Sequence, residues 1–251
     1  MAGGDAARGY NDAELLAVLL SREVRDGEIS ACGAHSMIPA AGLLLAQAGH
    51  APGAEIMILG SPAFSPFPTS RQFHFLAQRG DLGLFFVSGI QIDRRGNYNL
   101  HMIGGDPDRP EVRFPGGYGG GMIYYAARRS ILFRTEHTHR SFVERVDFVS
   151  AAGRTAPEIL RHGSPTKVVT PMATLRFDGG TGFLALESVH APHTAEQVRA
   201  CTGFDLGPSD AVPATQAPSR EELTLLRETV RSRMIETGTY AEWAETALGS
   251  A

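Results

Sequence analysis

Apolar residues recur along the first third of the chain with spacings that alternate between helical and strand-like. Apolar positions from 15 to 19 follow Asn11 and Asp12 at helical spacing, which predicts a capped helix that ends near residues 26–27. The elements expected next are a strand over 28–32, a helix over 38–50, a strand over 55–59, a helix over 72–78 and a strand over 82–87. Short apolar strands between helices predict an α/β fold with an open, mostly parallel sheet and helices on both faces.

The remainder of the chain is expected to add a C-terminal β-hairpin and helices. Residues 150–164 predict a loop with one helical turn, and the glycine-rich segment 178–182 between the β-prone runs 167–177 and 183–189 predicts a hairpin. Further elements are a helix over 195–201 capped by Thr194, an extended proline-rich strap over 208–218, a helix that follows the capping box Ser219-Arg-Glu-Glu222 and ends near 234, and a short helix over 240–248. We expect residues 1–251 to form a single domain, with its last helices in 219–251.

Composition narrows the class of protein. The chain has 251 residues, of which 43% are hydrophobic and 20% charged, as in ordinary globular domains. A net charge of −4 gives no general electrostatic reason to bind nucleic acid or an anionic membrane. Two distant cysteines form no disulfide framework. The N-terminus shows no signal-peptide pattern, and no apolar run reaches about 18 residues. We therefore expect a cytoplasmic protein.

Local clusters of basic and histidine side chains leave alternatives open. The basic positions at 128, 129, 134, 140 and 145 are typical of a solvated face, or they neutralise the phosphates of a nucleotide. The histidine pairs His137/His139 and His190/His193 lack the partners of a structural zinc site, so no metal is expected.

Two polar, glycine-containing segments are candidates for ligand binding. Gln91, Asp93, Asn97 and Asn99 follow the strand predicted over 82–87, and ligands of open α/β sheets bind beyond the carboxyl ends of strands. Asp93 and Asn97 are equally typical of turn building, whereas Gln91 favours function. The glycine run 116–121 precedes a predicted helix over 122–127 and is either a flexible turn or an anion-binding loop. Its spacing matches no nucleotide-binding fingerprint.

The strand predicted over 55–59 ends in Gly60-Ser61-Pro62. Ser61 lacks a G-x-S-x-G elbow, so it is more typical of a strand-to-loop turn than of a nucleophile. Cys32 is likewise expected to be a small buried residue rather than a reactive thiolate.

Five segments share their order and composition with one enzyme family: Ser88-Gly-Ile-Gln-Ile-Asp-Arg-Arg-Gly-Asn-Tyr-Asn99, Asp108-Arg-Pro110, Phe114-Pro-Gly-Gly-Tyr-Gly-Gly120, Arg140-Ser-Phe-Val-Glu-Arg-Val-Asp-Phe-Val149 and Cys201-Thr-Gly-Phe-Asp205. They resemble the G-A-Q-I-D-x-x-G-N-x-N, D-R-P, L-P-G-S-G-G, R-F-V-E-R-V-D-F-V and T-G-F-D-L segments of family I CoA-transferases. The chain is similar to the B (β) subunit of the glutaconate type.

The resemblance implies an open α/β subunit that works with a separate, similarly folded A (α) subunit, with the active site where the two meet. It implies an acyl-CoA substrate, coenzyme A only as part of that substrate, and neither a permanently bound cofactor nor a metal. It gives Gln91 an oxyanion or substrate contact. The residues that it places at the substrate or CoA are Ser88, Gly89, Ile90, Asn97, Asn99, Gly116, Gly117, Tyr118, Gly119 and Gly120.

The chain departs from the family at the catalytic glutamate, whose position falls on Gly60 or Ser61. One reading is that the heteromer now decarboxylates or hydrolyses a C–C bond of a carboxylated acyl-CoA, as divergent relatives do. A second is that the partner subunit supplies a glutamate and transfer persists. A third is a non-catalytic CoA-binding subunit, against which the intact Gln91 and glycine loops argue. Three phenylalanines are candidates for an acyl pocket or for the core: Phe64, Phe67 and Phe73.

Overall fold

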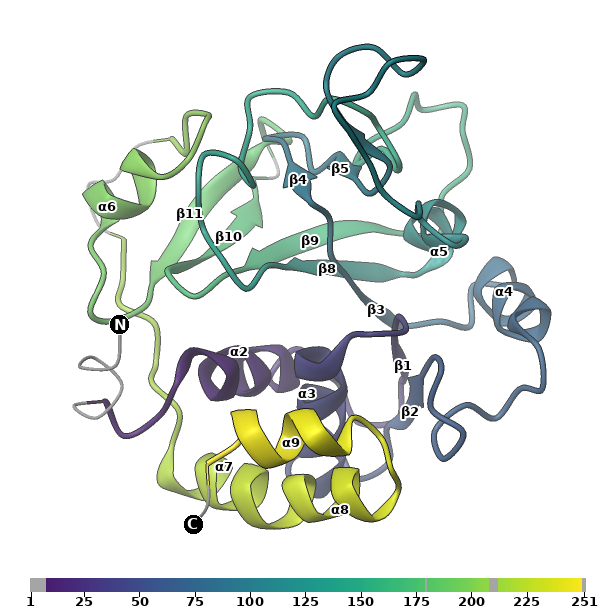
Figure 1. Cartoon of the computed structure of the whole chain (residues 1–251), viewed down its shortest axis with the longest axis vertical. Coiled ribbons are helices and arrows are strands. Elements are labelled where there is room, and N and C mark those ends of the chain that lie inside the picture. The colour runs from purple at the N-terminus through teal and green to yellow at the C-terminus, as the bar shows by residue number, and fades with distance from the viewer. Residues whose placement is uncertain (1–7, 179, 208–211, 250–251) are drawn as a thin grey trace. The chain divides into compact units, whose positions relative to one another are not determined.

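The computed structural model describes residues 8–178, 180–207 and 212–249 and shows two compact units, each built from separate segments of the chain (Figure 1). The first unit contains the residues up to 75, residues 82–86 and residues from 217 onward. The second contains residues 76–81 and 87–216. The expectation of a single domain stays a prediction.

The sheet of the first unit is parallel. Strand β1, Ile29–Cys32, pairs with β2, Glu55–Ile58, on one side and with β3, Leu84–Val87, on the other. All four residues of β3 are buried, as expected for a parallel strand covered on both faces. Helices α2, Asp12–Ser21, and α3, Met37–Ala48, pack against each other. The register places the carboxyl ends of the strands at Cys32 and Ile58 side by side.

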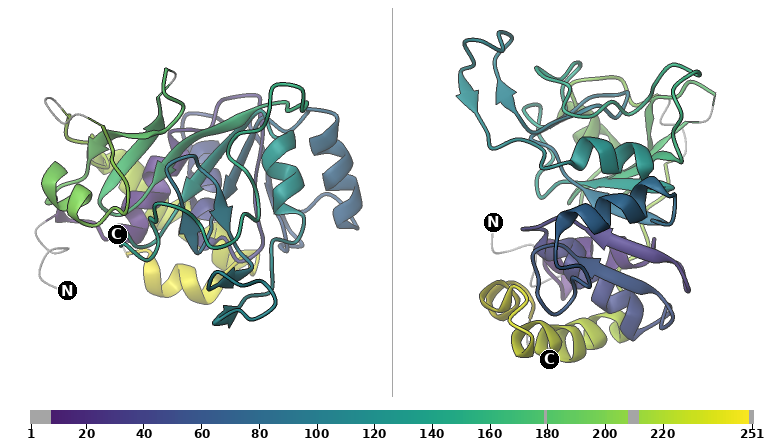
Figure 2. Two further views of the ribbon diagram at one scale, coloured as in Figure 1. Left: turned by 90° about the horizontal axis from the view of Figure 1, so that it is seen from above. Right: turned by 90° about the vertical axis from the view of Figure 1, so that its right-hand side faces the viewer.

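The C-terminal helices complete the first unit. They are α7, Arg220–Leu225, the π-helical turn η1, Leu226–Val230, α8, Arg231–Glu236, and α9, Ala241–Ala247. Figures 1 and 2 show them, in yellow-green to yellow, beside the purple helices α2 and α3, with which α7 and η1 make contact.

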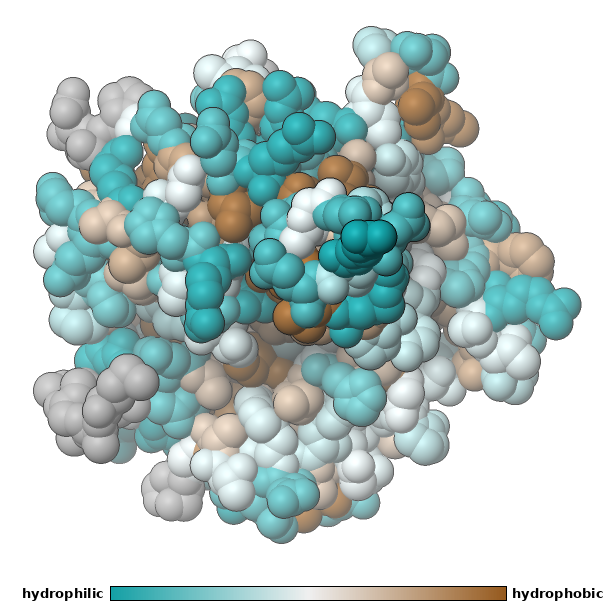
Figure 3. Space-filling model, turned by 45° about the horizontal axis from the view of Figure 1, so that its top comes forward, coloured by the Kyte–Doolittle hydropathy of each residue, from teal (hydrophilic) through white to brown (hydrophobic). Residues whose placement is uncertain are grey.

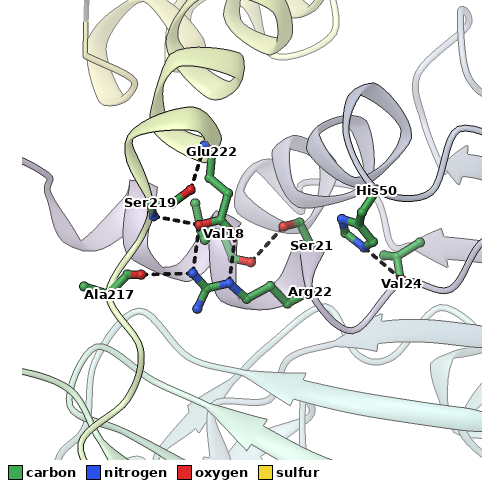
Figure 4. Close-up of polar contacts among 8 residues, drawn as sticks. All are labelled: Val18, Ser21, Arg22, Val24, His50, Ala217, Ser219 and Glu222. Atoms are coloured by element: carbon green, nitrogen blue, oxygen red, sulfur yellow. Dashed lines mark hydrogen bonds and ion pairs between the residues drawn. The ribbon is translucent and has the colours of Figure 1, made fainter.

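Two Arg–Glu pairs attach this helical layer to α2. The Arg22 guanidinium donates two hydrogen bonds of 2.8 Å to the Glu222 carboxylate, next to the Ser219 cap (Figure 4). Arg227 donates two, of 2.7 and 2.9 Å, to Glu14. The layer is therefore held at both ends of α2.

The second unit contains a mixed sheet and two short ribbons. Strand β8, Arg129–Phe133, is parallel to β9, Ser164–Val169, and β9, β10, Ala173–Phe177, and β11, Leu184–Val189, run antiparallel. Its helices are α5, Gly120–Ala126, and α6, Ala195–Ala200. The ribbons pair β4, Gln91–Ile92, with β5, Tyr98–Asn99, and β6, Met102–Ile103, with β7, Val112–Arg113.

The predicted α/β class is confirmed, and most elements lie where the sequence places them. The caps Asn11, Thr194 and Ser219 each form a capping box. The helix expected over 72–78 is α4, Ser70–Gln78, and the hairpin expected around 178–182 is β10–β11. Helix α2 ends at Ser21, short of the expected 26–27. Part of the strap, 208–211, lies outside the described residues.

One expectation requires correction, and one strand was not predicted. The run 167–177 is two antiparallel strands rather than one, because the chain turns at Thr170, whose amide bonds the Ala173 carbonyl at 3.0 Å. The segment 150–164 is a loop, as expected, and contains a hydrogen-bonded turn in which the Ile159 amide donates to the Ala156 carbonyl at 3.0 Å. Strand β8 does not emerge from the sequence pattern, because its short apolar run follows the basic pair at 128–129.

Candidate functional site

The signature segment 88–99 folds into a ribbon within the second unit. Gln91 pairs with Asn99 and Ile92 with Tyr98. Asp93 closes the turn between them, because its carboxylate accepts from the amides of Arg95 and Asn97 at 2.9 and 3.1 Å and from the Asn97 side chain at 2.8 Å. Burial raises the pKa of the Asp93 carboxyl against these hydrogen bonds. Asp93 and Asn97 thus build the turn, which was one of the two readings of the sequence.

The Gln91 side chain joins two segments of the second unit through hydrogen bonds and thereby acts as a brace. Its amide nitrogen donates to the Asp147 carboxylate at 3.1 Å, and its oxygen accepts from the Asp147 amide at 3.0 Å and from the Asn99 side chain at 2.8 Å. Asn99 in turn accepts from the amide of His101 at 3.0 Å. Both amide side chains are buried. They fix the ribbon to the segment around 147, and the substrate contact of Gln91 stays a prediction.

The three residues before Gln91 are also engaged within the unit. Ser88 donates its hydroxyl to the Phe133 carbonyl at 2.8 Å, and the Ile90 amide donates to the Asn99 carbonyl at 2.8 Å. A Cβ on Gly89 would lie 2.8 Å from the Cβ of Tyr98, so only glycine fits there. The Ile90 N–H thus has a partner within the chain, and the contacts of Ser88, Gly89 and Ile90 with a substrate stay predictions.

A carboxylate that the sequence did not single out lies beside this segment. Arg134 donates to the Gly89 carbonyl at 2.8 Å and to the Glu136 carboxylate at 2.6 Å. The Ser141 hydroxyl also donates to Glu136. The hydrogen bond from Ser141, with Arg134 close by, holds the pKa of Glu136 below its ordinary value despite partial burial. An ionised carboxylate is thus tied, through Arg134, to the Gly89 backbone.

The glycine loop 116–120 lies against the same ribbon. A Cβ on Gly116 would be 3.1 Å from Nε2 of His101, whose Nδ1 lies 2.5 Å from the Ser150 hydroxyl. A Cβ on Gly120 would be 3.1 Å from the Tyr98 hydroxyl, which is buried and has no partner among the described residues. Tyr118 is 85% exposed with a left-handed φ of 45°. Two of the predicted groups, the signature and the glycine loop, therefore come together in the second unit.

The strand end at Gly60-Ser61 belongs to the first unit and forms a tight turn. Gly60 has φ of 85°, and a Cβ added there would lie 3.3 Å from that of Ala34. The Ser61 hydroxyl is buried and lies 2.7 Å from the Thr239 hydroxyl. Its partner is thus another neutral hydroxyl rather than a base, which favours the turn reading of Ser61 over the nucleophile reading.

The neighbouring thiol and phenylalanines have structural surroundings. Cys32 is fully buried, and burial raises the pKa of its thiol, which confirms an inert side chain. Phe73 belongs to the core. Phe64 is buried beneath the Arg233 guanidinium, 4.9 Å from its ring centre, and Phe67 is half-buried.

One histidine of each pair is buried, His137 in the first and His190 in the second. His137 stacks on Phe142, and its ring nitrogens each lie 2.9 Å from a threonine hydroxyl, that of Thr170 or Thr202. Burial lowers the pKa of His137 to about 4, with smaller effects from His190 and other histidines. In the part of the chain that the structure describes, no three side chains of the metal-binding types gather at one point.

A family model described as coenzyme A transferase matches residues 41–199, which is more than half of the chain. The chain belongs to the coenzyme A transferase family. The prediction of an acyl-CoA enzyme is thereby confirmed at the level of the family. Within the described residues, none of the helices has the length and hydrophobicity that a membrane crossing requires. Hydrophilic side chains predominate on the face in Figure 3, with the hydrophobic ones mostly in the recesses between them.

Relatives that are named for different reactions are similar to this chain in sequence. The B (β) subunit of the glutaconate CoA-transferase of Acidaminococcus fermentans is 27% identical over 252 aligned positions, which cover 88% of this chain and 92% of that protein. The corresponding subunit of a 3-oxoadipate CoA-transferase from Pseudomonas knackmussii is 29% identical over 67% of this chain and 66% of its own length. The cholesterol ring-cleaving hydrolase IpdB subunit of Rhodococcus jostii is 31% identical over 58% of each chain.

Solved structures agree with the fold. The glutaconate coenzyme A-transferase of Acidaminococcus fermentans superimposes with a TM-score of 0.76 at 26% identity, covering 88% of this chain and 95% of that chain. The decarboxylase AibA/AibB superimposes with a TM-score of 0.75 at 22% identity, over 86% of this chain and 93% of that chain, which shows the fold alone.

Proposed function

We propose that this chain is the B-type subunit of a heteromeric enzyme that cleaves a C–C or C–COO⁻ bond of a carboxylated acyl-CoA. In this proposal no glutamyl-CoA intermediate forms, and the second subunit is an A-type homologue. The observation that carries the proposal is the turn at the end of β2. Gly60 and Ser61 form this turn, and the resemblance to the family puts its nucleophilic glutamate at one of these two positions.

Neither residue of the turn accommodates a glutamate without rebuilding. Gly60 has a left-handed backbone, which costs a side-chain-bearing residue roughly 1–2 kcal/mol. The Ser61 side chain is enclosed and bound to Thr239, so a longer charged group would lose this bond and meet buried surface. Glu55 lies at the other end of the strand, about 15–17 Å away along an extended chain. None of Gly60, Ser61 and Glu55 therefore supplies a carboxylate at the strand end.

Bond cleavage at a carboxylated thioester requires no such nucleophile. When the C–COO⁻ bond breaks, its electron pair enters the thioester as an enolate, CO₂ leaves, and the enolate takes a proton from water or an acid. In hydrolytic C–C cleavage, water adds to a ketone, which leaves as a carboxylic acid while the other fragment becomes the enolate. Preorganised hydrogen-bond donors stabilise either enolate. The hydrogen bond from Arg134 and the close packing of Gly89 hold the backbone around this residue in place. Preorganised donors require a backbone that is fixed in this way.

The relatives and a structural neighbour are named for several different reactions, which supports a reaction other than transfer for this chain. Two of them are named as CoA-transferase subunits, one as a ring-cleaving hydrolase subunit, and a structural neighbour as a decarboxylase. The names of the first three describe one subunit of a larger enzyme, and the name of the decarboxylase gives two components. We therefore assign a heteromeric arrangement to this chain as well.

The test is product analysis with the reconstituted heteromer. The chain is purified with an A-type subunit and incubated with glutaconyl-type and 2-oxo-ring acyl-CoAs, with acetate as CoA acceptor. Mass spectrometry then follows the products. We expect CO₂ or a ring-opened acyl-CoA and no acetyl-CoA, with deuterium from D₂O on the α-carbon of a cleaved ring and on the α- or γ-carbon of a decarboxylated glutaconyl-type ester. An enzyme-bound CoA thioester that borohydride reduces would overturn the proposal in favour of transfer.

A matched variant removes the remaining carboxylate of the strand. Glu55→Gln is expected to keep turnover within about twofold, because Glu55 is solvent-exposed at the strand start. A loss of turnover in Glu55→Gln together with trapped thioester would identify Glu55 as a relocated nucleophile. Absence of turnover with CoA binding retained would point to a non-catalytic CoA-binding subunit.

A further inference from the structure

A cleft of about 690 Å³ in the second unit is lined by the turn of the signature ribbon and by the segment at 144–145. Its lining side chains are Asp93, Arg94, Arg95, Asn97, Glu144 and Arg145. This volume is within the range of small-molecule sites, roughly 300–1,000 Å³. Neither the predicted glycine loop nor the Gln91 brace lines it.

The three arginines of the cleft have no acidic partner. Within the described part of the chain, Arg94, Arg95 and Arg145 form no ion pair, whereas Arg134 and Arg227 each bind a glutamate. Three guanidinium groups that converge from two segments repel one another unless an anion is bound.

The acidic residues of the cleft neutralise this charge only in part. The Asp93 carboxylate is buried and already accepts three hydrogen bonds from Arg95 and Asn97 groups of its own turn. Glu144 is exposed and has no ion pair among the described residues. Even with both carboxylates ionised, three positive charges face two negative ones, and one of the two is directed into the turn.

The cleft also has a rigid wall. The Arg94 guanidinium lies 3.8 Å above the ring centre of Phe183, and that of Arg95 lies 5.6 Å from it. A Cβ on Gly96 would lie 2.3 Å from Phe177, so the hairpin strands β10 and β11 support the turn from beneath. The position of Arg94 is therefore set by stacking before any ligand binds, which lowers the entropy lost on binding.

We infer that this cleft binds a phosphate-bearing anion through Arg94, Arg95 and Arg145. Guanidinium forks match pairs of phosphate oxygens, and a polyanion neutralises three arginines where a single carboxylate does not. The inference rests on the proposed function only where the ligand is coenzyme A, whose nucleotide carries phosphates of this kind, and pyrophosphate tests the cleft independently of it. Failure of the inference leaves the proposed bond cleavage untouched.

The test is isothermal titration calorimetry of the full chain with pyrophosphate and with adenosine 3′,5′-bisphosphate, and with succinate as a carboxylate control. Arg95→Gln/Arg145→Gln removes two exposed cleft charges, and Arg71→Gln/Arg109→Gln removes two exposed charges that do not line the cleft. Loss of two charge-assisted contacts is expected to weaken binding of both phosphate probes by about tenfold or more, against less than about twofold for the control pair. Glu144→Gln is expected to tighten binding, because it removes a repulsive charge.

Each other result overturns the inference. Equal weakening by the two double variants would show general charge attraction, and equal affinity for succinate would show that phosphate is not the recognised group. Absence of heat with either phosphate probe at low salt would show that the cleft binds neither. Unchanged thermal unfolding of the variants verifies that they are folded.

Discussion

Replacing Glu14 by glutamine tests whether the C-terminal helices are held by one buried ion pair. The Glu14 carboxylate is only 1% exposed and accepts four hydrogen bonds. Two come from Arg227, one from the Gly249 amide at 3.0 Å and one from the Asn11 amide at 3.1 Å. Burial opposes ionisation of Glu14, but these donors together hold the pKa of Glu14 below its ordinary value.

Glu14→Gln exchanges one acceptor oxygen for an N–H donor that faces other donors. Breaking a buried pair from one side costs about 3–5 kcal/mol, so we expect a loss of this size in the free energy of unfolding. For a chain of this length that corresponds to a fall in Tm of roughly 6–20 °C. Equilibrium urea unfolding, followed by circular dichroism, measures the loss.

Two other substitutions calibrate the result. Glu222→Gln breaks the more exposed pair with Arg22, whose side chains are each 26% exposed, and is expected to cost only about 1 kcal/mol. Glu221→Gln removes an unpaired charge from the first turn of α7 and should change stability by less than about 0.5 kcal/mol. A cost for Glu14→Gln no larger than that of Glu222→Gln would refute the reasoning.

Four further outcomes follow from the structure. Burial lowers the pKa of His137 to about 4 from about 6.5, so the unfolded chain binds more protons than the folded chain between these pH values. The stabilisation should be complete above pH 6.5, and the free energy of unfolding should fall by about 3 kcal/mol towards pH 4. Urea titrations at several pH values measure this slope, which His137→Asn should flatten. Gly60→Ala should destabilise by about 1–2 kcal/mol in thermal unfolding, since it places a Cβ at a left-handed φ. Thr239→Val should cost about 1–3 kcal/mol and should cost less in a Ser61→Ala background, where no hydroxyl is left unpaired; equal costs in both would exclude the coupling. Tyr118→Gly should leave the Tm unchanged or higher, because it relieves a left-handed φ at an exposed residue, while turnover of the heteromer falls.

The elements that the sequence predicts well are those that local chemistry determines. A capping box joins residues three apart, so Asn11 with Glu14 and Ser219 with Glu222 are visible in the sequence. The turn built by Asp93 is local for the same reason. Strand β8 escapes prediction because its short apolar run directly follows the basic pair at 128–129, so the local pattern does not indicate a strand.

The contacts that shape the candidate site are long-range, and the sequence does not reveal them. Gln91 and Asp147 are 56 residues apart, and Ser61 and Thr239 are 178 apart. Asp147 lies within a segment that resembles the family, but the resemblance of that segment does not say which side chain Asp147 contacts. The sequence located the signature and the altered strand end, whereas the roles of Glu136 and Thr239 required the three-dimensional pairing.

These contacts change what the retained signature implies. An intact Gln91 and intact glycines argue against a non-catalytic subunit only if folding does not need them. Yet Gln91 has three hydrogen bonds within the chain, and Gly89 has no space for a Cβ. Folding alone therefore explains both, and they do not distinguish an enzyme from a binding protein. Tyr118 indicates a functional contact more directly, because an exposed aromatic ring on a left-handed backbone lowers stability, and no contact among the described residues accounts for it. A substitution that leaves the fold intact and abolishes turnover is therefore more informative at Tyr118 than at any braced residue of the signature.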